Sequence, residues 1–366
     1  MTASVVVIGA GLVGLSCAWL LRQRGHDVLL IGDDDPDSRG APGSEAALGV
    51  LMARVFHRSS GRGWRLRQRS LALWQAWRRE LAGRGRPIPW RQGLLLLASG
   101  PEDLERQRRL LQDPRRPPGL LEPWDRARLE ALTPEVPAAA LGGLYSAEDG
   151  QLDPMAALRA LAEDGAAAGV VRRAGRVMAL ERGGRGWQVW LAGGERLRGD
   201  WVVLAAGLGS ADLLPEGLGP IPLEPVLGQA LELEPDPIED GRAAVPWPGA
   251  VVWKGMNLIH RGGEGPGGRP RLWLGATLEP GERGADEALA RLRQLEGDAP
   301  AWLVGARQCR RWQGLRARPV GQPAPLLQDL GGGLLLTSGH YRNGVLLAPA
   351  SAEWVAERIA AGSGAT

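Results

Sequence analysis

The 366-residue sequence contains very little lysine and cysteine, and it lacks any long apolar run. Lys254 is the only lysine, and the arginines stand among acidic residues without forming a compact basic block, so we expect no nucleic-acid partner. Cys17 and Cys309 lie far apart without metal-ligand spacing, which predicts free thiols in a reducing compartment and no metal site. No stretch approaches the roughly 18 apolar residues that span a membrane. Since no signal-peptide pattern opens the sequence either, we expect a cytoplasmic protein.

Phenylalanine and tyrosine are scarce as well, with one and two residues against fifteen tryptophans. Hydrophobic residues make up 44% of the chain and charged residues 23%, the balance of an ordinary globular protein. The chain is too long for one ordinary core, so we expect two domains. Most of the scattered tryptophans are expected to fill the core or surface grooves.

The N-terminal segment has the pattern of a dinucleotide-binding unit. An apolar β-branched run at 4–8 predicts a strand that is buried on both faces. A Gly-x-Gly-x-x-Gly turn follows at 9–14, then a helical pattern at 15–24 and a second strand at 28–31. A glycine turn between a strand and a helix is the context that a dinucleotide fingerprint requires.

Each glycine of this turn has a physical role. Gly9 permits the tight bend, Gly11 lets backbone amides approach a pyrophosphate, and Gly14 lets the helix pack against the strand. The N-terminus of the helix favours the anion. The residues of the turn that we expect to bind the cofactor are Gly9, Ala10, Gly11, Val13 and Gly14.

The acidic residue that usually follows the second strand, where it holds the ribose hydroxyls, is replaced by Gly32. Asp33, Asp34 and Asp35 come directly afterwards. Two interpretations remain open: Asp33 takes the ribose role after a small shift of the backbone, or the three aspartates form a solvated loop.

The remaining pattern indicates a dinucleotide domain interrupted by a β-rich second domain. We expect the first domain to comprise 1–85, 141–220 and 305–366, and the second to comprise 86–140 and 221–304. Within them we expect helices at 64–82, 101–111, 126–132, 154–168, 286–295 and 347–360, a turn at 149–154, and strands at 92–97, 170–180, 186–191, 201–205, 229–233, 251–253, 258–260 and 271–276. Pro349 is then expected in the first turn of the last helix, where its missing N–H is tolerated.

Taken together, these segments resemble the FAD-dependent D-amino-acid oxidase family, and within it the glycine oxidases of thiamine biosynthesis most closely. The resemblance spans nearly the whole chain, and its most specific part is the terminal run 339–349. The other segments that carry it are 9–18, 44–51, 152–154, 202–207, 225–229, 274–277 and 312–316.

This resemblance implies an α/β fold, α+β overall, in which a Rossmann-like FAD-binding domain carries an inserted mixed β-sheet substrate domain. It implies non-covalent FAD, a small amino-acid or amine substrate, molecular oxygen as acceptor and a possible homo-oligomer. Beyond the first turn, the cofactor contacts that it implies are Asp33, Ser44, Ala46, Ala47, Gly49, Ala206, Gly207, Gly339, His340, Arg342, Asn343, Gly344, Val345 and Leu346.

The resemblance also implies the active-site residues Arg316, Arg342 and Tyr341. Arg316 matches the arginine that grips the substrate carboxylate, which suits a planar guanidinium that can donate two hydrogen bonds. Arg342 lies between two glycines and an apolar helix, so we expect it to be buried near a ligand. His340 could be mistaken for a catalytic base, and we interpret it instead as a packed residue that positions the turn.

The reaction that the resemblance implies is hydride transfer from the α-carbon of the substrate to the flavin, which gives an imine. Hydrolysis then yields a 2-oxo acid and ammonia, and oxygen is reduced to hydrogen peroxide. The last helix would aim its N-terminus at the flavin pyrimidine ring, where the reduced flavin gains negative charge.

The sequence departs from the family pattern at two places that bear on the substrate. Asn257 stands where the family often has tyrosine, and Ala317-Arg318-Pro319-Val320 replaces the usual Pro-x-Thr-Pro. Arg318 could therefore compete with Arg316 for the carboxylate or lie on the surface. Glycine is the leading substrate, and the alternatives are a D-amino-acid dehydrogenase that reduces a quinone and a flavin-dependent tRNA-modifying oxidoreductase.

Overall fold

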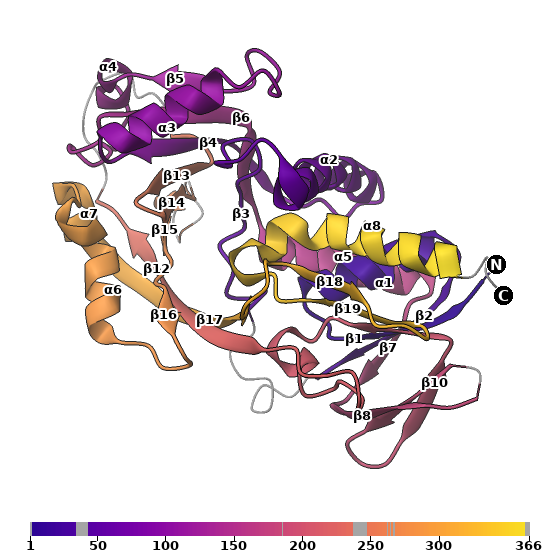
Figure 1. Cartoon of the computed structure of the whole chain (residues 1–366). Helices are drawn as coiled ribbons and strands as arrows, with labels where there is room; N and C mark the ends of the chain where they lie inside the picture. Colours follow the sequence, from indigo (N-terminus) through magenta and orange to yellow (C-terminus); the bar gives the residue numbers. More distant parts are fainter. Residues whose placement is uncertain are drawn as a thin grey trace.

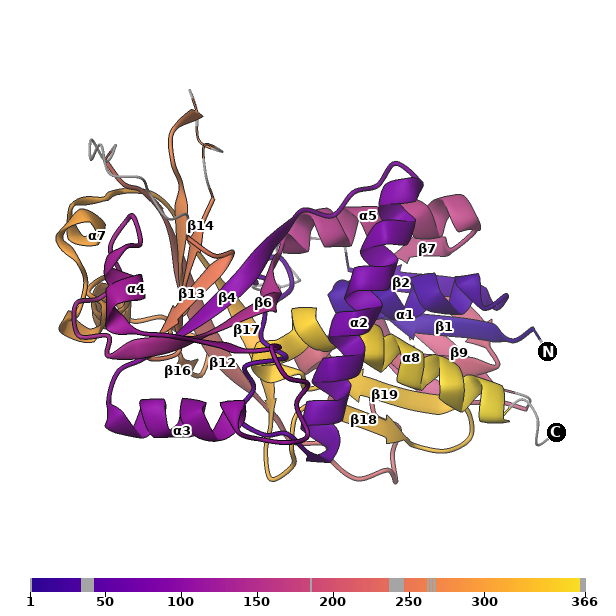
Figure 2. The same ribbon diagram turned by 90° about the horizontal axis from the view of Figure 1, so that it is seen from above.

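The computed structural model describes residues 2–33, 43–184, 186–236, 247–261, 263, 265 and 268–362. In these residues the strands form sheets of six, ten and three strands. The sheets of six and three strands lie at one end of the molecule and the ten-stranded sheet at the other (Figures 1 and 2). Both termini lie at the first end. No helix in these ranges is long and apolar enough to cross a membrane.

The six-stranded sheet is built from strands that are far apart in the sequence. Its neighbours are parallel except for the antiparallel pair at one edge, β18 with β19. In order across the sheet the strands are β18 (Leu326–Asp329), β19 (Leu334–Ser338), β11 (Trp201–Leu204), β1 (Ser4–Ile8), β2 (Asp27–Gly32) and β7 (Val171–Ala174). The start, middle and end of the chain therefore meet in one sheet, and the predicted strand at 4–8 is confirmed.

β1 is apolar from Val5 to Ile8 because both of its faces are covered there. Val5 and Val7 pack into a core shared with helices, whereas Val6 and Ile8 pack toward the three-stranded sheet. That small sheet is antiparallel and consists of β8 (Val177–Arg182), β9 (Trp187–Leu191) and β10 (Arg196–Gly199). A continuous apolar strand is what burial on two faces requires.

Four helices pack around the first face of the six-stranded sheet, and Figure 1 shows three of them, α1, α5 and α8, lying together over it. Asp153 caps α5, since its carboxylate accepts the N–H of Ala156 at 2.9 Å. Gly169 ends the same helix with a φ of 99°. The bounds are α1 (Leu12–Gln23), α2 (Gly61–Gly83), α5 (Pro154–Ala168) and α8 (Gly344–Gly362).

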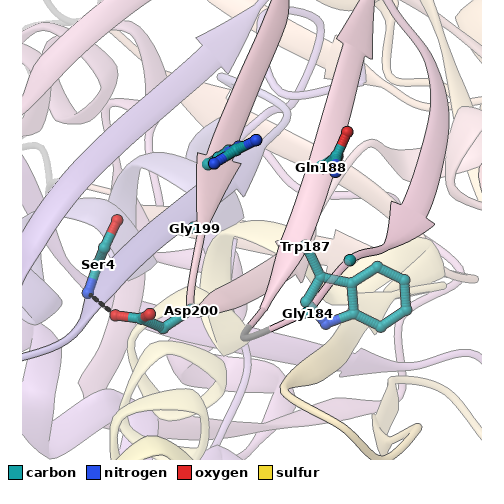
Figure 3. Close-up of a pocket in the computed structure, with 8 residues that line it drawn as sticks. Ser4, Gly184, Trp187, Gln188, Gly199 and Asp200 are labelled. Atoms are coloured by element: carbon teal, nitrogen blue, oxygen red, sulfur yellow. Dashed lines mark hydrogen bonds between the residues drawn. The ribbon is translucent and has the colours of Figure 1, made fainter.

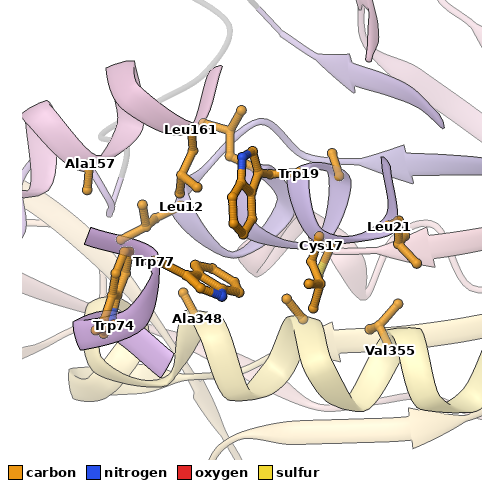
Figure 4. Close-up of a cluster of buried hydrophobic side chains, with 14 of the residues drawn as sticks. Leu12, Cys17, Trp19, Leu21, Trp74, Trp77, Ala157, Leu161, Ala348 and Val355 are labelled. Atoms are coloured by element: carbon orange, nitrogen blue, oxygen red, sulfur yellow. The ribbon is translucent and has the colours of Figure 1, made fainter. Parts of the chain in front are cut away.

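Three tryptophans form the centre of this helical core (Figure 4). The ring centroids of Trp74 and Trp77 are 5.8 Å apart, and those of Trp77 and Trp19 are 4.7 Å apart. The Trp19 indole donates to the carboxylate of Asp164 at 2.8 Å, and Arg84 also donates to that carboxylate. The expectation that tryptophan fills the core is confirmed for these three residues, which are at most 4% exposed.

The predicted start of the last helix is wrong. α8 begins at Gly344 rather than 347, so Pro349 lies inside the helix instead of in its first turn. A proline at this position leaves the carbonyl of Val345 without its helical N–H donor. The indole Nε1 of Trp74 donates to that carbonyl at 2.8 Å, and Ser70 Oγ accepts the N–H of Ala350 at 3.1 Å. Side chains of α2 therefore satisfy the backbone groups that the proline disturbs.

The ten-stranded sheet contains the central β-rich segment together with strands from elsewhere in the chain. Along its main path lie β16 (Glu279–Pro280), β12 (Leu223–Glu234), β15 (Leu272–Gly275), β14 (Met256–His260), β13 (Ala250–Trp253), β4 (Trp90–Ala98), β6 (Gly142–Leu152) and β3 (Val50–Leu51). β17 (Arg307–Pro319) pairs along the length of β12, and β5 (Glu122–Trp124) pairs with β6. The sheet mixes parallel and antiparallel pairs, as predicted.

The two faces of this sheet carry different partners. One face packs on the short outer helices through residues such as Leu95, Trp253 and Leu274. The other face, with Ile259 and Trp312, contacts the segment that includes Leu48. The outer helices on the first face are α4 (Arg126–Glu130), α6 (Asp286–Arg293) and α7 (Ala301–Gly305), whereas α3 (Pro101–Leu111) packs on the second face through Leu110. Because the second face looks toward the 43–55 segment of the chain, it is the face that can take part in a site.

Two further local predictions are wrong. Much of the turn expected at 149–154 is the end of β6, because residues 150–152 pair with β3 and β4. The strand expected at 170–180 is two strands, β7 and β8, which belong to different sheets. β6 and β17 fall inside ranges that we assigned to the first domain, yet both belong to the ten-stranded sheet. The domain boundaries themselves stay a prediction.

Candidate functional site

The glycine turn after β1 has the geometry of an anion-binding loop. The N–H of Gly9 bonds to the carbonyl of Ile31 at 2.8 Å, which ties the turn to the end of β2. A Cβ on Gly14 would lie 1.8 Å from the Gly9 carbonyl oxygen, so only glycine allows this helix to approach the turn so closely. α1 starts at Leu12, earlier than the predicted residue 15. Its N-terminus is therefore directly at the turn.

Ser44 joins the second predicted segment to this turn. Its Oγ accepts the N–H of Leu12 at 3.0 Å, and a Cβ on Gly11 would lie 3.1 Å from the same oxygen. Farther along, Trp312 Nε1 donates to the carbonyl of Ala46 at 3.0 Å. The structure thus brings Ser44 and Ala46, and the adjoining Ala47 and Gly49, between the glycine turn and the ten-stranded sheet. The carbonyl of Gly49 accepts the N–H of Leu152 of that sheet at 2.9 Å.

The turns after β11 and β19 reach the same edge of the six-stranded sheet. The N–H of Ala205 bonds to the carbonyl of Ile8 at 2.8 Å, and a Cβ on Gly9 would lie 2.9 Å from the Cα of Ala206. Ser338 Oγ donates to the carbonyl of Gly207 at 2.8 Å, so Gly339 follows beside that turn. The carboxyl ends of parallel strands are where α/β sheets bind their ligands.

Asp33 directly follows β2 at this same edge and is partly exposed. Asp34 and Asp35 lie outside the described residues. A Cβ on Gly32 would come within 2.5 Å of the Ala10 side chain, which explains why a small residue stands where an acid is usual. The ribose role of Asp33 stays a prediction.

The N-terminus of α8 approaches the site from the terminal run. The short helical turn η4 (Tyr341–Asn343) precedes it, and the N–H of Asn343 bonds to the carbonyl of His340 at 3.1 Å. Val345 and Leu346, in the first turn of α8, are buried. The long helix α8 begins at Gly344 and therefore directs its positive N-terminal end toward the strand edge that carries the glycine turn. This is the orientation predicted for a helix that stabilises a negatively charged group.

His340 is packed under this turn. It is 7% exposed, and its Nε2 lies 2.8 Å from Ser351 Oγ. Burial lowers the pKa of His340 to about 4, and the charge of Arg62 acts in the same direction. A neutral, hydrogen-bonded imidazole at neutral pH fits a residue that positions the turn.

Arg316 lies in β17 with its guanidinium over Gly228 of β12. A Cβ on Gly228 would be 2.1 Å from Nη2, so the absence of a side chain there creates the space for the guanidinium. Nη1 donates to the carbonyls of Leu227 at 3.1 Å and Thr277 at 3.2 Å. Burial lowers the pKa of Arg316 to about 10, with the charge of Arg342 as a second cause, and the group remains a cation at neutral pH.

Arg342 and Tyr341 belong to the same electrostatic neighbourhood, because both act on the pKa of Arg316. The side chain of Arg342 is exposed, and its expected burial against a ligand stays a prediction. η4 lies at the surface, and Arg342 Nη2 reaches across to the carbonyl of Gly255 in the turn between β13 and β14, at 3.0 Å. Tyr341 has a φ of 54°, an unusual backbone conformation for a non-glycine residue.

The two departures from the family pattern have clear structural positions. Arg318 forms an ion pair with Glu224 and is half-exposed, so the interpretation of Arg318 as a surface residue fits better than competition with Arg316. Asn257 Nδ2 donates to the carbonyl of Gly275 across the sheet at 3.1 Å.

Sequence reasoning missed Gly228 and Thr277 as neighbours of Arg316. Both lie in segments that carried the family resemblance, but their roles depend on strand register rather than on local pattern. A glycine inside an otherwise apolar strand was the available signal, because it often marks a close approach of another group.

A separate hollow lies beside the three-stranded sheet (Figure 3). Trp187 and Gln188 line it, and the carboxylate of Asp200 accepts the N–H of Ser4 at 2.8 Å there. Ser4 is the first residue of β1, whereas the glycine turn follows its last residue. The hollow is therefore at the opposite edge of the sheet from the candidate site.

The observed loop fits a bound dinucleotide such as FAD. The residues from Gly9 to Gly14 leave room beside the first turn of α1, where a Cβ on Gly11 would intrude between the backbone and Ser44. Helix N–H groups and a hydroxyl are the donors that a pyrophosphate accepts. Among the described residues no group of three or more His, Cys, Asp or Glu side chains is placed to hold a metal ion.

Comparison with known proteins gives a consistent result. Residues 4–358 match a family model described as FAD dependent oxidoreductase. A tRNA 5-methylaminomethyl-2-thiouridine biosynthesis bifunctional protein of Ralstonia nicotianae is 32% identical over 81% of this chain and 44% of its own length. A glycine oxidase of Geobacillus kaustophilus is 28% identical over 97% of this chain and 92% of its own length. The chain spans about half the length of the curated relatives that it matches first.

Solved structures share the fold. The crystal structure of glycine oxidase from Geobacillus kaustophilus superposes with a TM-score of 0.81 at 24% identity, covering 98% of this chain and 95% of that one. An iminodiacetate oxidase from Chelativorans sp. BNC1 gives a TM-score of 0.80 at 21% identity, covering 98% and 95%. At these identities the similarity establishes the architecture, which agrees with the predicted mixed α/β fold.

Proposed function

We propose that this chain, which belongs to the family of FAD-dependent oxidoreductases and binds FAD, oxidises glycine or another small amino acid or amine. The products would be an imine, then a 2-oxo acid and ammonia, with oxygen reduced to hydrogen peroxide. The observation that carries this proposal is the guanidinium of Arg316, seated over Gly228 on the sheet face that looks toward the 43–55 segment.

Arg316 suits the recognition of a small carboxylate. Among the described residues its side-chain hydrogen bonds come from Nη1, so Nε and Nη2 can form the fork that a carboxylate accepts in two bonds. Arg342 and Tyr341 would complete the wall around the substrate. Anchoring the carboxylate fixes the α-carbon in one orientation, and fixing the reacting carbon is a large part of catalysis.

The cofactor residues follow the geometry of the strand edge. We propose that Gly11, Ser44 and the first turn of α1 hold the pyrophosphate, and that Ala46, Gly49 and the first turn of α8 border the flavin ring. When bound, FAD accepts the hydride that leaves the α-carbon. No protein base is required for that transfer, and the neutral, packed His340 agrees with this.

The proposal is tested by measuring peroxide released by the FAD-loaded protein with glycine, sarcosine and D-alanine. Arg316→Lys should raise KM by about tenfold or more, because an ammonium cannot reproduce the planar fork. Arg318→Lys is the matched control and should leave KM unchanged, since Arg318 pairs with Glu224 at the surface. Equal effects of the two substitutions would rule out Arg316 as the anchor.

A quinone-reducing dehydrogenase is separated by the same assay. It would bleach the flavin absorbance under anaerobic conditions with the same substrates and release no peroxide in air. We propose the cytoplasm as the location, because Cys17 and Cys309 are both free thiols.

A second candidate, a flavin-dependent tRNA-modifying oxidoreductase, is favoured by one observation. A relative named for the biosynthesis of a modified tRNA nucleoside is 32% identical over 308 residues. This candidate predicts tRNA binding whose affinity falls steeply as salt concentration rises. A binding titration with bulk tRNA at about 50 mM and 200 mM salt tests it, and the absence of binding at the lower concentration would remove it.

A further inference from the structure

We propose that Glu279 is a positioning residue that fixes the backbone carbonyl on which Arg316 rests, and so presents the guanidinium to the substrate carboxylate. The inference rests on the proposed role of Arg316. Glu279 is in β16, on the far side of β12 from most of the sheet, and it is 9% exposed. Neither sequence pattern nor the expected chemistry of the flavin had singled it out.

A closed set of hydrogen bonds joins Glu279 to Gln229 of β12 and to Thr277, which lies between β15 and β16. The hydroxyl of Thr277 and the Nε2 of Gln229 both donate to Glu279 Oε1, Gln229 at 2.9 Å. In return the backbone N–H of Gln229 donates to Thr277 Oγ1 at 2.8 Å, and the N–H of Thr277 donates to the Gln229 carbonyl at 3.0 Å. Gln229 is fully buried and Thr277 is 8% exposed, so water cannot readily replace these bonds.

Arg316 rests on two carbonyl groups, and this set holds one of them, that of Thr277, in place. One acceptor of Nη1 is the carbonyl of Thr277 itself, at 3.2 Å. The other is the carbonyl of Leu227, at 3.1 Å, two residues before Gln229 in β12. If Glu279 releases Thr277 and Gln229, the Thr277 carbonyl becomes free to move, and the guanidinium loses one of the two acceptors that align its fork.

The charge of Glu279 also reaches Arg316. Burial opposes ionisation of Glu279, but bonds from Thr277, Ala285 and Gln229 outweigh it and lower the pKa of Glu279 below its usual value. The ionised carboxylate raises the pKa of Arg316, as does Tyr341, against burial and the charge of Arg342. Removing the negative charge should therefore make Arg316 lose its proton at a lower pH than about 10.

Glu279 has a structural role as well, which a test must separate from positioning. Its Oε2 accepts the N–H of Ala285, directly before α6, so the carboxylate helps to fasten that helix. A substitution could lower stability through α6 alone. The measurement must therefore report on the guanidinium rather than on folding.

The experiment uses the FAD-loaded protein and follows the visible flavin spectrum during titration with acetate, a bare carboxylate. The variants are Glu279→Gln, Arg316→Met and Asp286→Asn. Asp286 is the matched control. Its carboxylate forms an ion pair with Arg311, which in turn donates to Gln229, but the Asp286 side chain is 85% exposed. We expect acetate to bind Glu279→Gln about tenfold more weakly than the wild type, and Asp286→Asn equally well.

The same titration between pH 7 and 11 gives a second readout. The affinity for acetate should begin to fall at a lower pH in Glu279→Gln than in the wild type. Loosening of α6 alone would not change the pH at which this loss occurs. If Arg316→Met abolishes binding while Glu279→Gln matches Asp286→Asn in affinity and pH dependence, the positioning role is wrong and the proposed function stands. If Arg316→Met binds acetate like the wild type, the anchor itself is wrong and both proposals fall.

A further variant covers the case in which Glu279→Gln does not fold. Thr277→Val keeps the side-chain volume and the carboxylate but removes the hydroxyl that links Glu279 to the backbone of Gln229. We expect weaker acetate binding, with the pH of the alkaline loss unchanged because the charge remains. Wild-type affinity in a folded Thr277→Val protein would overturn the proposal.

Discussion

The indole of Trp74 donates to the one carbonyl of α8, that of Val345, whose usual donor is missing because Pro349 lies four residues further on. This bond joins two helices across the core at 2.8 Å. It allows a proline inside a helix whose first turn borders the proposed flavin site.

Replacing Trp74 with phenylalanine removes this donor and leaves a buried carbonyl unpaired. We expect the free energy of unfolding to fall by about 1–3 kcal/mol, and the flavin to bind more weakly because the start of α8 loosens. Urea unfolding with and without added FAD measures both effects. Trp77→Phe is the control, as Trp77 is on the same helix and equally buried but donates to no α8 carbonyl in the described contacts. Equal losses in the two variants would show that indole volume, not the hydrogen bond, matters.

Substituting Gly14 by alanine should abolish flavin binding. The new Cβ would sit 1.8 Å from the Gly9 carbonyl oxygen, so either α1 or the turn must move. The ratio of flavin to protein absorbance after purification reports the loss. Gly83→Ala at the end of α2, where a Cβ meets nothing within 4 Å, should keep the wild-type ratio. Full flavin content in Gly14→Ala would contradict the close approach of helix and turn.

Gly228→Ala tests the seat of Arg316 without touching the cofactor. The added methyl group meets the end of a flexible side chain, so the guanidinium moves aside and the fold should survive. We expect normal flavin content and a change in unfolding free energy below about 1 kcal/mol. KM for the amino-acid substrate should rise by tenfold or more, as measured by initial-rate kinetics. A variant with unchanged KM would place the substrate carboxylate elsewhere.

His340 should make the protein less stable in mild acid. Its folded pKa, about 4, lies below the ordinary value of 6.5, so the unfolded chain binds more protons between these values. Stability from this group is fully present above pH 6.5 and is lost as pH falls toward 4, by up to about 3 kcal/mol. Urea unfolding at pH 7, 5.5 and 4.5 should show a smaller decline in His340→Asn than in the wild type. An identical decline in both proteins would mean that the imidazole is not held neutral.

Local pattern predicted the elements that are determined by nearby residues. The β1 strand, the α3 and α5 helices and the glycine turn followed from apolar period, caps and glycine spacing, and all lie where expected within a few residues. The start of α8 could not be predicted in this way, because Pro349 is tolerated only through Trp74 and Ser70, which are remote in sequence.

The candidate site, like the fold, could be predicted only where short segments of sequence determine it. A family motif indicated Arg316 and the terminal run, and the structure gathers their segments around one sheet edge. The exposure of Arg342 depends on where η4 meets the β13–β14 turn. Gly228 and Glu279 acquire their roles from the register of β12 with β17 and from a bond across strands, which no local pattern encodes.

The order of strands in the six-stranded sheet has a consequence for synthesis of the protein. β1 and α1 are synthesised before β11, which pairs with β1, before β19, which pairs with β11, and before α8, which packs on α1. Until those segments appear, the apolar surfaces of β1 and α1 lack their native cover, and such surfaces attract chaperones and promote aggregation. The cofactor loop is thus made before the segments that complete its surroundings, so a nascent chain arrested before β19 should be unable to retain FAD.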